Sequence, residues 1–85
     1  MKRFYILAIV DLDNYGYNTK KVIMYDDKEK AIAKMKELYL EQFYKHYSKD
    51  YNPYAQDTYA YQITDDFAYI NGTYYIDIFN TDLEY

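Results

Sequence analysis

The dipeptide Asn71-Gly72 lies between two runs in which apolar and polar residues alternate. Asn-Gly tolerates the positive φ angles of a two-residue β-hairpin turn and is the strongest short-range hairpin signal in a sequence. The flanking runs read TYAYQITDDFAYI and TYYIDIFN. We therefore predict two antiparallel strands here, so that the rest of the chain must complete and cover an antiparallel sheet.

A two-residue turn also predicts the register of this hairpin. Asp66 would face Asp77 directly, and directly opposed residues share one face of a sheet. The apolar, helix-facing side would consist of Phe67, Tyr69, Tyr74, Ile76 and Ile78. The outer side would consist of Asp66, Ala68, Thr73, Tyr75 and Asp77. Opposed aspartates are mildly destabilising, so we expect this pair to be screened by solvent or to meet a cation or a basic partner.

The first half of the chain predicts a second hairpin followed by a helix. Residues 3–12 are apolar on both faces, which indicates a central strand. A turn is expected at 13–18, and 20–25 has the weaker alternation of an edge strand. Residues 27–48 lack Gly and Pro and carry an apolar stripe at three- and four-residue steps. This pattern predicts one long amphipathic helix.

The predicted fold is α+β, with the element order β-β-α-β-β. We expect a four-stranded, mainly antiparallel sheet with the helix packed on one face. Asp26 and Glu29 predict the helix start because they form a capping-box-like pair. A length of 85 residues predicts a single domain, residues 1–85.

Composition excludes several chemistries. The chain has no cysteine and a single histidine, His46, which rules out thiolate zinc sites, cysteine nucleophiles and histidine pairs on a metal. Two glycines do not suffice for a glycine-rich phosphate loop. We expect no catalytic residues and no cofactor. No apolar stretch reaches the length of a membrane span, and we expect no membrane partner.

The segment DLDNYGYN at residues 11–18 resembles the start of a calcium loop. An EF-hand, however, needs a ligand at the fifth loop position and a bidentate Glu at the twelfth. Tyr15 and Val22 occupy those positions, and a strand rather than a helix precedes the loop. We therefore predict no metal site and interpret the segment as a hairpin turn.

Charge is divided unevenly along the chain, whose net charge is −4. All ten Lys and Arg residues lie at or before Lys49, together with seven acidic residues. From Asp50 onward there are seven acidic residues and no basic one. The chain also has 15 tyrosines. A thin core cannot hold them all, and interfaces favour exposed tyrosine. Part of the acidic surface would pair with the lysine-rich helix, and the remainder predicts docking on a basic protein surface.

In its small size, acidity, tyrosine content and lack of cysteine, the chain resembles the small anti-defence proteins of bacteriophages, anti-CRISPR proteins in particular. The hairpin YINGTYYIDIFNTDLE looks like the acidic Asn-Gly hairpin of some inhibitors of Cas9-type nucleases. The resemblance implies a non-catalytic inhibitor in the cytoplasm of a bacterial host. It would occupy the basic nucleic-acid-binding groove of a CRISPR effector as a DNA mimic, with carboxylates where phosphates would lie.

Docking of this kind needs spaced negative charge and aromatic anchors. We expect the charge to come from Asp57, Asp65, Asp66, Asp77, Asp82 and Glu84. We expect the anchors to be Tyr59, Tyr61, Tyr75 and Tyr85. A second patch would comprise Asp11, Asp13, Tyr15 and Tyr17. The strand order decides whether the two patches share a surface.

Two alternatives remain open. The first is that the chain is a generic protein-interaction module or a homodimer joined through exposed tyrosines or an edge strand. The second, which is less favoured, is direct nucleic-acid binding through the lysine-rich helix. Phosphate contacts dominate such binding, and Glu29, Glu37 and Glu41 interrupt the basic helix surface.

Overall fold

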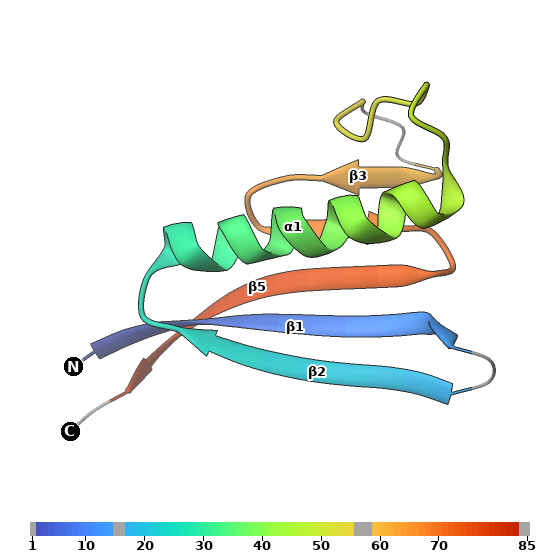
Figure 1. Ribbon diagram of the computed structural model, residues 1–85. Coiled ribbons are helices and arrows are strands. Elements are labelled where there is room, and N and C mark those ends of the chain that lie inside the picture. The colour runs from blue at the N-terminus through green and yellow to red at the C-terminus, as the bar shows by residue number, and fades with distance from the viewer. Residues whose placement is uncertain (1, 15–16, 56–58, 84–85) are drawn as a thin grey trace.

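A computed structural model describes residues 2–14, 17–55 and 59–83. Within these ranges one helix and five strands follow in the order β1 (Lys2–Asn14), β2 (Tyr17–Tyr25), α1 (Lys28–His46), β3 (Tyr61–Ile63), β4 (Phe67–Ile70) and β5 (Tyr74–Leu83) (Figure 1). The α+β class is confirmed. The predicted four-stranded sheet is wrong by one strand, because the element order is β-β-α-β-β-β.

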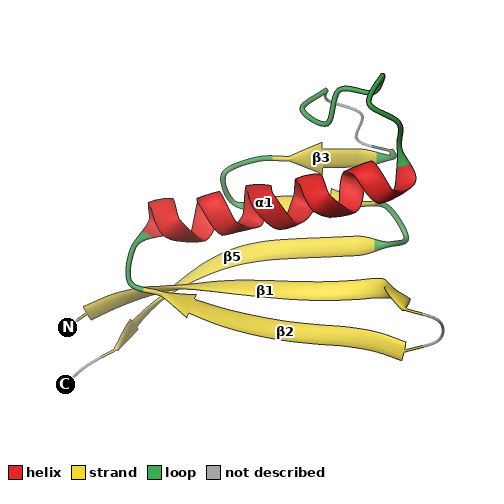
Figure 2. Cartoon of the chain, in the orientation of Figure 1, coloured by secondary structure: helices red, strands yellow, loops and turns green. Residues whose placement is uncertain are grey.

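The sheet has the order β2-β1-β5-β4-β3, and every neighbouring pair is antiparallel. The prediction that the first strand is central is confirmed, because β1 lies between β2 and β5. β2 is an edge strand, also as predicted. The last strand of the chain, β5, is inserted between β1 and β4, so the N-terminal and C-terminal hairpins are neighbours in one sheet (Figure 2).

The additional strand arises from a turn at Thr64. The Thr64 hydroxyl accepts hydrogen bonds from the backbone N–H groups of Asp66 and Phe67, each at 3.1 Å. The Thr64 N–H also donates to the Phe67 carbonyl at 2.8 Å. This side-chain-to-backbone bonding stabilises a tight turn. The run TYAYQITDDFAYI at 58–70, predicted as one side of the hairpin, therefore contains two strands, β3 and β4, that pair with each other.

The predicted register of the last hairpin is wrong by one residue. Ile70 pairs with Tyr74 rather than Thr73, so the loop contains three residues. Gly72 has φ +77°, and the Thr73 N–H donates to the Ile70 carbonyl at 3.0 Å. These are features of a type II turn with glycine at its third position. Because side chains alternate along a strand, the one-residue shift moves every β4 side chain to the opposite face.

The helix is two residues shorter at its C-terminal end than predicted and begins one residue later. Asp27 is the N-cap, and its side chain accepts a hydrogen bond from the Glu29 N–H at 2.9 Å. The predicted Asp26–Glu29 capping box is wrong because Asp27 already provides this bond at the first turn. Tyr47 is the C-cap.

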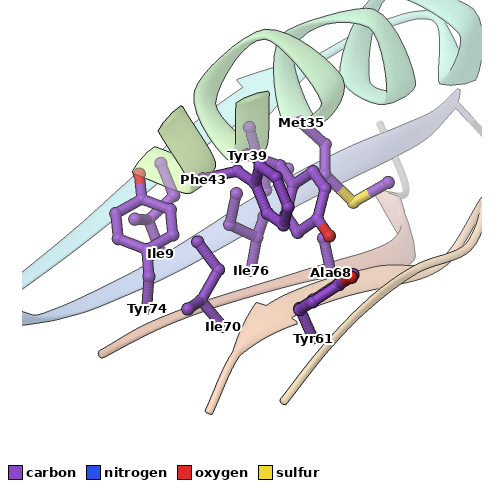
Figure 3. Packing of buried hydrophobic residues seen from close by; sticks show 10 residues of the cluster. Ile9, Met35, Tyr39, Phe43, Tyr61, Ala68, Ile70, Tyr74 and Ile76 are labelled. Carbon is purple, nitrogen blue, oxygen red and sulfur yellow. The ribbon is translucent and has the colours of Figure 1, made fainter. Parts of the chain in front are cut away.

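The core lies between α1 and one face of the sheet (Figure 3). Met35, Tyr39 and Phe43 line one side of the helix and are fully buried. They pack on the inward-facing side chains of the strands, which include Leu7, Ile9, Tyr61, Ala68, Ile70, Tyr74 and Ile76. The Tyr39 hydroxyl donates to the Pro53 carbonyl at 2.7 Å and so fixes the segment that follows the helix.

The shape of the molecule reflects this one-sided packing. Its principal extents are 47 × 29 × 18 Å, and its radius of gyration is 13.8 Å. A compact domain of 85 residues has a radius of gyration of about 12 Å. Of the described elements, only α1 packs on the sheet, and it covers one face. The opposite face is left open by the part of the chain that the structure describes.

Candidate functional site

The uncovered side of the sheet is mainly apolar. Register partners share a face, so the side chains that alternate with the buried ones define this side. We call it the open face. It consists of Phe4, Ile6, Ala8, Val10, Lys20, Val22, Met24, Gln62, Phe67, Tyr69, Tyr75, Asp77, Phe79 and Thr81. Val22 is 66% exposed, Met24 53% and Phe79 55%. Adjacent large apolar side chains at this exposure are unusual on a monomer.

The open face has two halves of different character. Ile6, Ala8 and Val10 on β1 adjoin Val22 and Met24 on β2, through the register pairs Ile6 with Met24 and Ala8 with Val22. We call these five residues the aliphatic half. None of these five side chains carries a ring or a charge.

Aromatic rings occupy the other half. Phe67 and Tyr69 on β4 lie beside Tyr75 and Phe79 on β5, and we call these four residues the aromatic half. The rings of Phe67 and Tyr69 are stacked with centroids 6.2 Å apart, and those of Tyr69 and Tyr75 with centroids 6.3 Å apart. The rings thus form a continuous row across two strands.

Hydrogen bonds hold two of these rings in place. The Tyr75 hydroxyl accepts from the Gly72 N–H at 2.7 Å and donates to the Asn71 Oδ1 atom at 3.2 Å. The Tyr69 hydroxyl donates to the Gln62 Oε1 atom at 3.3 Å. Side chains that are already ordered lose less conformational entropy when a partner covers them. Tyr69 and Tyr75 are therefore ordered side chains within the aromatic half.

Two charged groups lie among these apolar side chains. Asp77 is exposed near the centre of the open face, between Ala8 on β1 and Phe67 on β4. Lys20 is exposed on the edge strand β2, at the level of Val10. Neither has an ion-pair partner among the residues that the structure describes. Burial of either group by a partner therefore requires an opposite charge on that partner.

The predicted pairing of Asp66 with Asp77 is wrong. Asp77 lies opposite Phe67, and Asp66 lies on the helix side of the sheet. There its carboxylate is 3.5 Å from the Lys28 ammonium at the start of α1. Both groups are largely exposed, so the pair contributes at most about 1 kcal/mol. The prediction that part of the acidic stretch pairs with the lysine-rich helix is met at this position.

The predicted tyrosine anchors have different surroundings. Tyr61 is only 6% exposed and contacts Phe43 edge-to-face with centroids 4.8 Å apart, so it belongs to the core. Tyr59 is 88% exposed, and its carbonyl accepts from the Asn71 side-chain amide at 2.9 Å. Tyr75 lies on the open face. Tyr85 lies outside the described residues.

Of the predicted acidic residues, the side chains of Asp65, Asp66 and Asp77 are described, and these three are divided between the β3–β4 turn and the open face. Asp65 is exposed at the β3–β4 turn beside Asp66, far along the sheet from the C-terminal end of β1 (Figure 1). The backbone of Asp82 belongs to β5, and its side chain is not described. Asp57 and Glu84 lie outside the described residues.

The second predicted patch adjoins the last hairpin. The Leu12 N–H donates to the Thr73 carbonyl at 2.8 Å, so the C-terminal end of β1 and the turn after β4 lie at the same end of the sheet. Tyr15 lies outside the described residues, and only the backbones of Asp13 and Tyr17 are described. Asp11 is half-buried on the helix side.

Asp11 influences a buried tyrosine. Asp11 pairs with Tyr74 across β1 and β5. Burial, together with the negative charges of Asp11 and Glu41, raises the pKa of the Tyr74 hydroxyl to about 12. Burial also raises the pKa of Tyr39, and the neighbouring Tyr61 raises it further. Both phenols are neutral at physiological pH and act as structural groups.

The sequence interpretation missed Val22, Met24 and Phe79 as surface residues. The signal that could have revealed an uncovered apolar face was the presence of apolar residues on both faces of β1, because a single helix covers only one face of a sheet. Which residues of β2 and β5 lie beside those of β1 depends on the strand order, and the sequence pattern does not determine that order.

The described residues form no pocket and hold no group of three or more His, Asp or Glu side chains placed to bind a metal ion. Among the same residues, no helix is long and apolar enough to cross a membrane. No protein-family model, curated protein or solved structure matches this chain.

Proposed function

We propose that this chain is a non-catalytic protein-binding module that docks through the open face. The observation that carries the proposal is the exposure of Val22, Met24 and Phe79 on a sheet face that the described chain leaves uncovered. Interfaces bury large apolar and aromatic side chains at their centres and carry few charges there. The open face has this composition.

The extent of exposed surface supports docking. The chain exposes 5899 Å². A compact monomer of 10.4 kDa exposes about 5,400 Å². Ten register pairs join β1 and β5, so these two central strands are about 33 Å long. β2 adds eight pairs and β4 only four. The resulting footprint of roughly 500 Å² is more than half the contribution of one partner to a standard protein interface.

Inhibition of a defence nuclease through a basic groove is a second candidate. The observation in its favour is Asp77, an exposed acid at the centre of the open face that would meet a cation on such a partner. Asp65 and Asp66 lie at a separate turn, so apolar contact rather than charge mimicry dominates the proposed docking. In this second case, binding weakens steeply as salt rises.

Site-specific photocrosslinking in the native host tests the proposal. A photoreactive benzoylphenylalanine replaces Phe79 on the open face or, as a matched control, Tyr44 on the helix side. The two residues have similar exposure, 55% and 47%. We expect one discrete adduct from position 79 and none from position 44. The mass of the adduct then distinguishes a second copy of this chain from a different protein.

Equal adducts from both positions, or none from position 79, would contradict docking through the open face. A second substitution checks the result without the photoreactive group. Phe79→Asp places a charge among the apolar side chains and should abolish the complex. Circular dichroism should report a folded protein, because Phe79 is not part of the core.

A further inference from the structure

The two halves of the open face are complementary to each other. The aliphatic half lies on β1 and β2, the aromatic half lies on β5 and β4, and the boundary between them follows the β1–β5 ladder. A two-fold axis along this boundary would place the aromatic half of one copy on the aliphatic half of another. Packed sheets interdigitate in this manner, with their strands nearly aligned and about 10 Å between the sheets.

The same axis pairs the two charges of the open face. It places β1 of the second copy over β5 and β2 of the second copy over β4. Lys20 of the second copy is then offset from Asp77 by one strand and two residues along the strand. Their Cα atoms are roughly 13 Å apart across the interface, a gap that extended Lys and Asp side chains close. Two symmetry-related ion pairs result.

Without such pairing, contact between two copies would bury Asp77 and Lys20 at a substantial cost in desolvation. The area is also sufficient. Two faces of roughly 500 Å² bury about 1,000 Å² in total, which is the threshold for a specific interface. A second copy thus provides the size, the apolar character and the opposite charge that the open face requires.

We propose that the partner of the open face is a second copy of this chain. The dimer is a face-to-face sandwich with one helix on each outer side and reciprocal Lys20–Asp77 ion pairs between the copies. This inference rests on the proposed docking function and names the partner of that surface. The edge strand β2 remains at the side of the sandwich.

Charge reversal and remixing test the dimer. Lys20→Asp alone places two acids together at each pair, and Asp77→Lys alone places two lysines together. We expect each variant to weaken self-association at least about tenfold. An equimolar mixture of the two variants contains matched charges only when one copy of each combines. We therefore expect sedimentation velocity to show the heterodimer in the mixture and monomers in each separate sample.

Lys36→Asp is the control, because it makes the same charge change on the exposed side of the helix. This variant should remain dimeric. Failure of the mixture to associate would overturn the Lys20–Asp77 pairing. Wild-type protein that remains monomeric at high micromolar concentration would overturn the dimer. If position 79 still crosslinks to a different protein, the docking function stands and only the second copy is excluded as its occupant.

Discussion

The helix-facing side and the open face of the sheet are built from similar side chains in different surroundings. Tyr74 and Tyr75 are neighbours in β5, yet Tyr74 is buried beneath α1 and Tyr75 lies on the open face. Phe43 is fully buried, whereas Phe79 is 55% exposed. The comparison shows that side-chain type alone does not separate a folding core from an uncovered sheet face. The element that covers each face decides the difference.

The two phenylalanines provide the largest test of this comparison. Phe43→Ala should lower the free energy of unfolding by about 3–5 kcal/mol, because it removes buried contacts and leaves a cavity. Phe79→Ala should lower it by less than about 1 kcal/mol. Urea unfolding at low protein concentration measures both free energies in the Asp77→Lys background, which is chosen because the proposed self-association would be weakened in it. Equal losses would show that the open face belongs to the core of the isolated chain.

Tyr74 and Tyr75 provide a second test, in which the expected effect is smaller and depends on pH. The pKa of Tyr74 is raised from 10.0 to about 12 in the folded state. Between pH 10 and pH 12 the unfolded chain therefore loses this proton while the folded protein retains it, so the stability falls as pH rises. The buried phenol should contribute on the order of 2 kcal/mol to this alkaline loss.

Tyr74→Phe should remove that part of the loss, and the contribution of Tyr39 should remain. Urea unfolding at several values between pH 8 and pH 12 measures the change. Tyr75→Phe is the matched control on the open face. The same reduction in both variants would contradict the assignment of the effect to the buried side.

The smallest test concerns the turn that assigns β4 side chains to their faces. Gly72 has φ +77°, and a Cβ atom placed there would meet no atom within 4 Å. Gly72→Ala should therefore cost about 1 kcal/mol from backbone strain alone. Gly72→Asn should cost less, because asparagine adopts this conformation more readily. A higher melting temperature for Gly72→Ala than for Gly72→Asn would contradict the explanation by backbone strain.

The helix and both hairpins were predictable because their signals are local. The three- and four-residue stripe indicated α1, and Asn71-Gly72 indicated the β4–β5 turn. The register was not predictable, because Asn-Gly fits both a two-residue turn and the observed three-residue loop. In the structure the Tyr75 hydroxyl bonds to Asn71 and Gly72 and stabilises the longer loop.

The candidate site was less predictable than the fold. Asp77 and Tyr75 were expected on an outer face, and they lie on the open face. Their apolar neighbours could not be foreseen, since the insertion of β5 beside β1 depends on contacts between distant segments. The one-residue register error also assigned Phe67 and Tyr69 to the core, which concealed the aromatic half.

The insertion of β5 between β1 and β4 has a consequence for the order of folding. The β1–β5 ladder joins residues 2–11 to residues 74–83, so almost the whole described chain must be available before the centre of the sheet closes. Closure of such a long loop costs entropy before any contact compensates for it. During synthesis on the ribosome, β1, β2 and α1 would emerge early, but β1 could pair with β5 only after β5 is synthesised. Sheet formation is therefore expected to be a late, cooperative step that follows synthesis of the last strand.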